Sequence, residues 1–152
     1  MKTVLFLCTA NYYRSRFAEI LFNYLAADRN VKWVAESRGL ARNDPDQNVG
    51  ALSRFARQGL TRRGIRLGDE NRWPRKVTER DLHKADLIVA VKETEHRPLL
   101  MASFPAWTDR VEYWHIDDID CADPNAALAV LEQQVNALIT RLSWPDARPI
   151  PA

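Results

Sequence analysis

The sequence predicts an α/β fold: a single three-layer αβα domain in which helices cover both faces of a four-stranded parallel sheet. Short apolar runs of strand length alternate with longer segments of helical periodicity, and strands joined by helices form right-handed crossovers in a doubly wound sheet. Residues 3–7 and 85–91 are apolar almost without interruption, as expected of strands buried on both faces. A chain of 152 residues is long enough for one such domain with a single core.

The predicted elements alternate from the N-terminus onward. Short apolar runs predict strands over residues 3–7, 31–36, 85–91 and 111–115. Apolar residues spaced three and four apart predict helices over residues 15–28, 50–64, 79–84, 93–102 and 124–142, with 65–77 irregular. Thr78 and Asp81 form a capping box for the third helix, and Asp123-Pro124 supplies the N-cap and first residue of the last. We expect the domain to span residues 1–143, followed by a proline-rich C-terminal tail over 144–152.

Composition and charge exclude several classes of protein. The 22 basic and 20 acidic residues leave a net charge of +2, which gives no general attraction for nucleic acid. No apolar run is long enough for a membrane span or a signal peptide, and two cysteines are too few for a disulfide framework. We therefore expect a cytoplasmic protein with no nucleic-acid and no membrane partner; the sequence does not indicate an oligomeric state. His83, His96 and His115 lack ligand spacing and no nucleotide-binding loop is present, so neither a metal nor a cofactor is expected.

The chemistry is expected where the first strand meets the first helix. The strand ends at Cys8, and Arg14 and Ser15 follow it, with Ser15 placed to cap the helix. The N–H groups of such a loop and the helix dipole form an anion site, which favours a cysteine thiolate, and a guanidinium clamps two phosphate oxygens. This set predicts cleavage of a phosphate ester through a phosphocysteine. The spacing alone also fits a buried cysteine at a strand end with a solvated arginine beyond it.

The stretch VLFLCTANYYRSRFAE, residues 4–19, resembles the signature of the low-molecular-weight protein tyrosine phosphatases, Cys-x-Gly-Asn-x-Cys-Arg-Ser-Pro-x-Ala-Glu. The match keeps Cys8, Asn11, Arg14, Ser15, Ala18 and Glu19. The sequence departs from the signature at three positions. Ala10 replaces a glycine, which adopts positive φ without cost, and Arg16 replaces a proline. Tyr13 replaces a second cysteine, which in the family can shield the nucleophile in a disulfide.

The resemblance implies roles for individual residues. Cys8 would be the nucleophile and Arg14 the phosphate clamp, while Asn11 would brace the loop and Ser15 would donate a hydrogen bond to the Cys8 sulfur. The phosphate-binding loop would comprise Thr9, Ala10, Asn11, Tyr12, Tyr13, Arg14 and Ser15. The resemblance also implies the flavodoxin-like strand order 2-1-3-4. One of the two tyrosines could stack on an aryl substrate or pack against the following helix.

A phosphatase of this type needs a general acid for the leaving oxygen. Residues 116–123 follow the fourth predicted strand and contain four aspartates: Asp117, Asp118, Asp120 and Asp123. We predict Asp118, because Ile116-Asp117-Asp118 keeps the hydrophobic-x-Asp spacing of the family's acid, and Asp120 is the next candidate. A solvated acidic loop is the alternative interpretation.

The predicted function is hydrolysis of phosphotyrosine or a related aryl phosphate monoester, on a phosphorylated protein or a small aryl phosphate. One alternative is a phosphate- or phosphotyrosine-binding module without turnover. Another is an arsenate reductase on the same scaffold, which would need two further cysteines where only Cys121 is available. Cys121 is either a resolving thiol or an inert buried one. Basic residues form either a solvated surface or a docking site for acidic phosphopeptides: Arg54, Arg57, Arg62, Arg63, Arg66, Arg72, Arg75 and Lys76.

Overall fold

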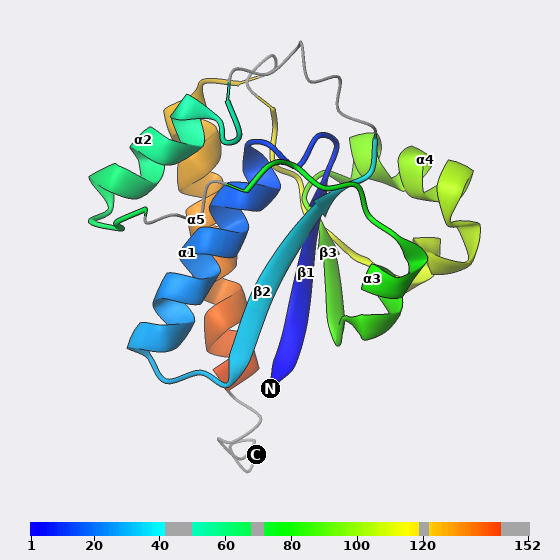
Figure 1. Ribbon diagram of the computed structural model, residues 1–152, viewed down its shortest axis with the longest axis horizontal. Coiled ribbons are helices and arrows are strands. Elements are labelled where there is room, and N and C mark those ends of the chain that lie inside the picture. The colour runs from blue at the N-terminus through cyan, green and yellow to red at the C-terminus, as the bar shows by residue number, and fades with distance from the viewer. Residues whose placement is uncertain (42–49, 68–71, 119–121, 144–152) are drawn as a thin grey trace, which may run out of the picture.

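A computed structural model describes residues 1–41, 50–67, 72–118 and 122–143 (Figure 1). Four parallel strands form the sheet: β1 (Lys2–Cys8), β2 (Trp33–Gly39), β3 (Leu87–Ala90) and β4 (Glu112–Tyr113). Their order is β2-β1-β3-β4, which confirms the predicted order 2-1-3-4. Two candidates from the sequence, Asp120 and Cys121, lie outside the described residues, as does the tail over 144–152.

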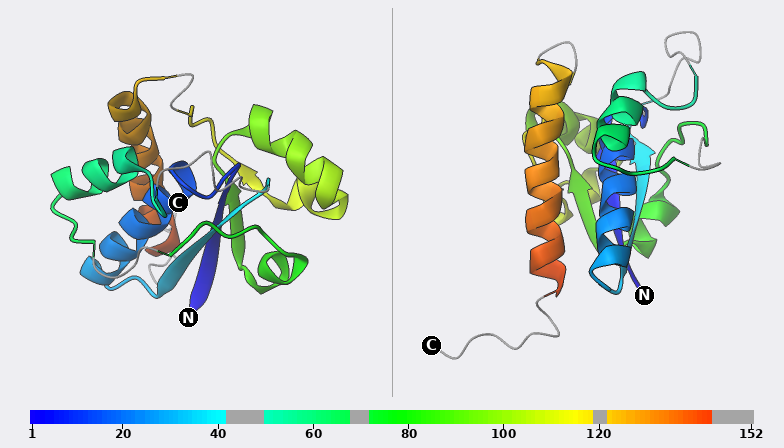
Figure 2. Two further views of the ribbon diagram at one scale, coloured as in Figure 1. Left: turned by 45° about the horizontal axis from the view of Figure 1, so that its top comes forward. Right: turned by 90° about the vertical axis from the view of Figure 1, so that its left-hand side faces the viewer.

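Helices cover both faces of the sheet, as predicted (Figure 2). They are α1 (Arg14–Asp28), α2 (Arg54–Arg62), α3 (Glu79–Lys84), α4 (Glu93–Ser103) and α5 (Pro124–Ser143), with a 3-10 turn η1 (Pro105–Arg110) after α4. The helices α1, α2 and α5 lie on one side, and α3 and α4 on the other (Figure 1).

The central strand β1 explains how one apolar run serves two cores. Successive side chains of a strand point to opposite faces. Val4, Phe6 and Cys8 therefore join the core on the α1 and α5 side, while Leu5 and Leu7 join the core on the α3 and α4 side. Cys8, the last residue of the strand, consequently faces the helix that follows it.

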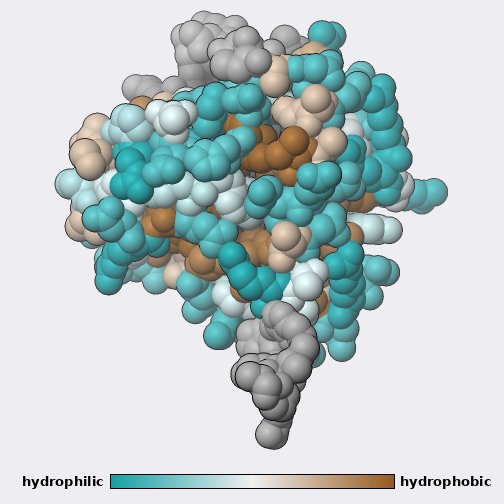
Figure 3. Space-filling view, turned by 180° about the vertical axis from the view of Figure 1, so that it is seen from behind, coloured by the Kyte–Doolittle hydropathy of each residue, from teal (hydrophilic) through white to brown (hydrophobic). Residues whose placement is uncertain are grey.

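Hydrophilic side chains cover most of the face seen from behind, with smaller apolar patches between them (Figure 3). No helix among the described residues is long and apolar enough to cross a bilayer.

Several boundaries differ from the predictions for identifiable reasons. The strand β2 runs three residues further than predicted because Ser37, Arg38 and Gly39 continue the parallel register alongside Phe6, Leu7 and Cys8. The helix α2 begins only at Arg54 because the Ser53 hydroxyl caps it, accepting a hydrogen bond from the Phe55 N–H at 3.2 Å. The turn η1 was not predicted.

The predicted helix caps are right in two cases and wrong in one. Thr78 and Asp81 form the expected capping box of α3. Asp123 accepts a hydrogen bond from the Ala126 N–H at 3.1 Å, as a cap of α5 should. Ser15 does not cap α1: it lies within the helix, the N-cap position is Tyr13, and no side chain caps that end. The reason is that the Ser15 hydroxyl is engaged by the Cys8 sulfur.

Candidate active site

The loop between β1 and α1 folds closely over the end of β2. A Cβ atom at Gly39 would lie 2.9 Å from the carbonyl oxygen of Thr9, so only glycine leaves room for the loop at this point. The Leu40 and Ala41 N–H groups donate to the carbonyl oxygens of Cys8 and Thr9 at 2.8 and 2.9 Å. The end of β2 therefore fixes the path along which the loop leaves Cys8.

The turn of the loop depends on Asn11, not on Ala10. Asn11 has a φ of 55°, whereas Ala10 is not among the residues with positive φ. Asparagine tolerates this left-handed conformation better than most residues. The family's glycine at the position of Ala10 is therefore not required for a left-handed turn in this chain.

Cys8 is almost fully buried, at 2% exposure, and its sulfur receives donors from the loop. The Asn11 N–H donates to it at 3.3 Å, and the Ser15 hydroxyl lies 2.9 Å away. The side-chain amide of Asn11 donates to the Ser15 oxygen at 2.8 Å, which leaves the hydroxyl hydrogen of Ser15 for the sulfur. Hydrogen bonds donated to a sulfur favour its thiolate form. The family resemblance predicted the contact with Ser15.

Arg14, the first residue of α1, places its guanidinium beside Cys8. It is 2% exposed; Nη1 donates to the Ile116 carbonyl oxygen at 2.9 Å, and Nη2 lies 2.6 Å from Glu95 and 3.4 Å from Asp118. Burial alone would lower the pKa of Arg14, but the negative charges of Cys8, Glu95 and Asp118 outweigh it, and the pKa is raised. Arg14 is thus a buried, fixed cation that contacts Glu95 and Asp118 and lies beside Cys8.

Glu95, in the first turn of α4, was not identified from the sequence. One of its oxygens, Oε2, accepts hydrogen bonds from the Thr9 hydroxyl, from Arg14 Nη2 and from His96 Nε2, the last at 2.9 Å. Burial raises the pKa of Glu95, but the bonds from His96, Arg14 and Thr9 outweigh it and hold the pKa well below its ordinary value. Glu95 therefore joins Thr9, the first residue of the loop, to Arg14 near its other end.

His96 holds Glu95 in place as a neutral ring. The ring is fully buried, and its Nδ1 accepts the Lys92 N–H at 3.0 Å, so the proton resides on Nε2, toward Glu95. Burial lowers the pKa of His96 more than the neighbouring carboxylate raises it. Their place in the chain is the one signal in the sequence that could have indicated Glu95 and His96. The helix α4 begins directly after β3, and ligand sites form at the carboxyl ends of parallel strands.

Asp118 is the predicted acid that the structure places at the site. Its carboxylate is about one third exposed and lines the same pocket as Cys8 and Arg14. Asp117 is paired instead with Lys92 at 2.8 Å, and Asp123 caps α5. Of the described aspartates in this segment, only Asp118 combines access to the pocket with contact to Arg14.

The pocket in front of Cys8 is walled by the phosphate-binding loop and the N-terminal end of α2. Tyr12 is partly exposed on its wall. Tyr13 is buried: its ring meets Phe55 edge-on at 6.5 Å, and burial, with Asp118 adding to it, raises its pKa to about 12. Tyr13 therefore serves mainly in packing, and Tyr12 and Phe55 are the partly exposed aromatic residues of the described pocket lining.

The other departure from the signature, Arg16, also has a structural role. Arg16 is 1% exposed and donates to the Ala51 carbonyl oxygen at 3.1 Å, which ties the pocket wall to α1. Burial, reinforced by nearby Arg72, lowers the pKa of Arg16 to about 10.

Comparison with known proteins agrees with this geometry. The model of the family described as low molecular weight phosphotyrosine protein phosphatase matches residues 3–143. The chain belongs to this family. A low molecular weight phosphotyrosine protein phosphatase from the pig, Sus scrofa, is 34% identical over 101 residues, which span 64% of this chain and 60% of the pig protein.

Solved structures of the phosphatase family show the same fold. A low molecular weight protein tyrosine phosphatase from T. tengcongensis superposes with a TM-score of 0.76 at 24% identity, covering 93% of this chain and 99% of that one. YwlE arginine phosphatase from Geobacillus stearothermophilus superposes with a TM-score of 0.74 at 18% identity, covering 99% of this chain and 100% of that one. Within the part of this phosphatase-family chain that the structure describes, no three His, Cys, Asp or Glu side chains gather as metal ligands would.

Proposed function

We propose that this chain is a phosphatase that hydrolyses phosphotyrosine or related aryl phosphate monoesters, on proteins or small molecules, through a phosphocysteine intermediate. The observation that carries the proposal is the sulfur of Cys8, with donors at 2.9 and 3.3 Å, in one pocket with Arg14 and Asp118. A nucleophile, a cation for the phosphoryl oxygens and an acid for the leaving group are together sufficient for this reaction class.

In the first step the Cys8 thiolate attacks phosphorus and the bond to the phenolic oxygen breaks. The N–H groups of residues 9–15 and the Arg14 guanidinium bind the phosphoryl oxygens as charge shifts onto them. Protonated Asp118 gives its proton to the departing phenolate. Its contact with Arg14 is long, at 3.4 Å, so the carboxyl group can turn from the guanidinium to the leaving oxygen.

In the second step water attacks the phosphorus of the phosphocysteine. The Asp118 carboxylate takes a proton from this water, the S–P bond breaks, and phosphate leaves as the thiolate is restored. The hydroxyl of Ser15 is placed to donate to the departing sulfur. A positioned acid and base of this kind contributes about 10²–10⁴-fold to the rate.

The charge of the pocket supports an aryl phosphate rather than phosphoarginine as substrate. Its described lining carries three guanidinium groups, Arg14, Arg54 and Arg57, against the single carboxylate of Asp118. Such a lining repels a substrate that carries its own guanidinium, whereas Tyr12 and Phe55 offer aromatic surfaces to a phenyl ring. Hydrolysis of phosphoarginine is the second candidate function. It is supported only by the fold that this chain shares with the arginine phosphatase among the similar structures.

The direct test compares wild type with Cys8→Ser and Arg14→Lys on a chromogenic aryl phosphate. We expect turnover by the wild type, none by Cys8→Ser with vanadate binding retained, and a large loss for Arg14→Lys, because lysine cannot bind two oxygens in a fixed plane. Phosphoarginine and arsenate are assayed in parallel. Binding without turnover by the wild type would indicate a binding module, and preference for phosphoarginine or arsenate would overturn the substrate assignment.

A further inference from the structure

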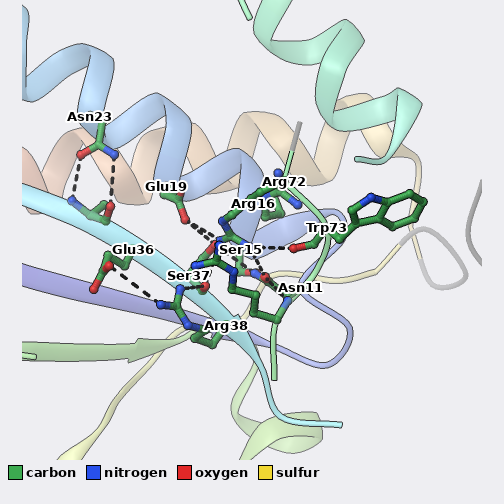
Figure 4. Close-up of polar contacts among 12 residues, drawn as sticks. Asn11, Ser15, Arg16, Glu19, Asn23, Glu36, Ser37, Arg38, Arg72 and Trp73 are labelled. Atoms are coloured by element: carbon green, nitrogen blue, oxygen red, sulfur yellow. Dashed lines mark hydrogen bonds and ion pairs between the residues drawn. The ribbon is translucent and has the colours of Figure 1, made fainter. Parts of the chain in front are cut away.

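We infer that Arg72 is a positioning residue for the proposed phosphatase reaction: it fixes the direction of the hydrogen bonds that end on the Cys8 sulfur. Arg72 lies in the irregular segment between α2 and α3, far from the signature in the sequence. In the structure its side chain reaches behind the phosphate-binding loop, among Asn11, Glu19 and Ser37 (Figure 4).

The guanidinium of Arg72 bridges three structural elements. Nη1 donates to Asn11 Oδ1 at 3.0 Å, and Nη2 donates to Glu19 Oε1 at 3.0 Å, to the Ser37 carbonyl oxygen at 3.0 Å and to the Ser37 hydroxyl at 2.9 Å. It thereby joins the loop, the helix α1 and the strand β2. Arg72 is about one fifth exposed, so these bonds are partly shielded from water.

Two hydrogen bonds to one oxygen atom fix the orientation of the Asn11 side-chain amide. Its Oδ1 accepts from the Arg72 guanidinium at 3.0 Å and from the Arg75 main-chain N–H at 3.1 Å. A flipped amide would direct its own N–H groups at both donors. The Nδ2 group must therefore point the other way, toward Ser15 at 2.8 Å and Ser37 at 2.9 Å.

The orientation of the amide then sets the two serine hydroxyls. Because each serine oxygen receives an N–H of Asn11, each hydroxyl hydrogen is free to be donated elsewhere. Ser37 donates its hydrogen to Glu19 at 2.6 Å. Ser15 is left to donate to the Cys8 sulfur at 2.9 Å, which is the direction that stabilises a thiolate. Arg72 thus acts on the nucleophile through Asn11 and Ser15 without touching the substrate.

Removal of Arg72 is expected to weaken this arrangement without abolishing it, because the Arg75 main-chain donor remains. We expect Arg72→Ala to lower kcat/KM for an aryl phosphate by about tenfold, the scale of one charge-assisted hydrogen bond. The rate at which iodoacetamide alkylates Cys8 is measured as a function of pH by mass spectrometry of the peptide that contains Cys8. In Arg72→Ala we expect this pH profile to move to higher pH. Arg72→Lys should be intermediate, since a single ammonium lacks the planar fork in which two nitrogens donate separately to Asn11 and Glu19.

The matched control is Lys76→Ala, which removes an exposed cation of the same segment. It should leave both kcat/KM and the alkylation profile unchanged. The proposed route from Arg72 through Asn11 and Ser15 to Cys8 is tested in a Ser15→Ala background. There Arg72→Ala should no longer shift the pH profile of alkylation. An unchanged profile for Arg72→Ala in the wild-type background, or an equal shift with and without Ser15, would overturn the inference.

Two safeguards keep the test decisive. If Arg72→Ala does not fold, Arg72→Lys supplies the comparison, and an unshifted profile for it would contradict the proposed route. If the wild type does not hydrolyse aryl phosphates, the proposed function fails, but vanadate affinity and Cys8 alkylation still report on Arg72.

Discussion

The contact between Glu95 and Arg14 can be tested by removing one charge while keeping the side-chain shape. In Glu95→Gln the amide oxygen can still accept a hydrogen bond, but Arg14 loses the carboxylate that lies 2.6 Å from its Nη2. Glu95 also organises Thr9 and His96 through the same oxygen. The substitution therefore disturbs both ends of the phosphate-binding loop.

The expected magnitude follows from the burial of the pair. A hydrogen bond to a charged group contributes about 1.5–3 kcal/mol, and removing one partner of a fully buried ion pair costs about 3–5 kcal/mol. Glu95 is about one third exposed, and Cys8 and Asp118 remain beside Arg14, so the lower range applies. We expect kcat/KM to fall by about 10- to 100-fold, at about 1.4 kcal/mol per factor of ten.

The assay measures kcat and KM on an aryl phosphate together with the free energy of unfolding in urea. The control is Glu93→Gln in the same helical turn, because Glu93 pairs on the surface with Arg97 and should be nearly silent. The stabilisation from Glu95 is present above its ordinary pKa of 4.5 and is lost as the pH falls below that value, so the difference in stability between wild type and variant should shrink there. Equal effects of Glu95→Gln and Glu93→Gln would refute the role of Glu95.

Three further perturbations test other parts of the site. Asp118→Ala should slow esters of poor leaving groups by about 10²–10⁴-fold and good ones much less, and equal losses would move the acid elsewhere. His96 is held neutral by burial in the folded protein, whereas in the unfolded protein it binds a proton below pH 6.5. The free energy of unfolding should therefore decline as the pH falls below 6.5, and thermal unfolding of His96→Gln should lack this pH dependence. Gly39→Ala would place a Cβ 2.9 Å from the Thr9 carbonyl oxygen and should cost about 1–3 kcal/mol in stability and weaken vanadate binding; wild-type affinity would show that the loop can move aside.

The sequence predicted the parts of the site that are contiguous in the chain. Cys8, Asn11, Arg14 and Ser15 lie on one strand, loop and helix, so their spacing alone brings them together. The assignment of Ser15 as a helix cap was wrong because capping preference describes a helix end in isolation, while here the hydroxyl contacts the sulfur. The family resemblance, and not the spacing, implied the contact between this hydroxyl and Cys8.

The residues that support this loop come from distant segments and carry no local pattern. Glu95 and His96 are two ordinary residues of a helical turn, and only the packing of α4 beside β3 directs them at Thr9 and Arg14. Arg72 lies in an irregular segment, where no periodicity predicts the direction of a side chain. Such positions depend on tertiary structure, and single-sequence reasoning does not reach them.

The covalent intermediate is the central claim, and trapping it is the most direct test. Asp118→Ala is mixed with an aryl phosphate of a good leaving group and quenched in acid within one turnover, and the peptides are analysed by mass spectrometry. We predict one phosphoryl group on the peptide that contains Cys8, and on Cys8 itself. Consumption of the substrate with Cys8 unmodified, or with the phosphoryl group on another residue, would contradict the mechanism.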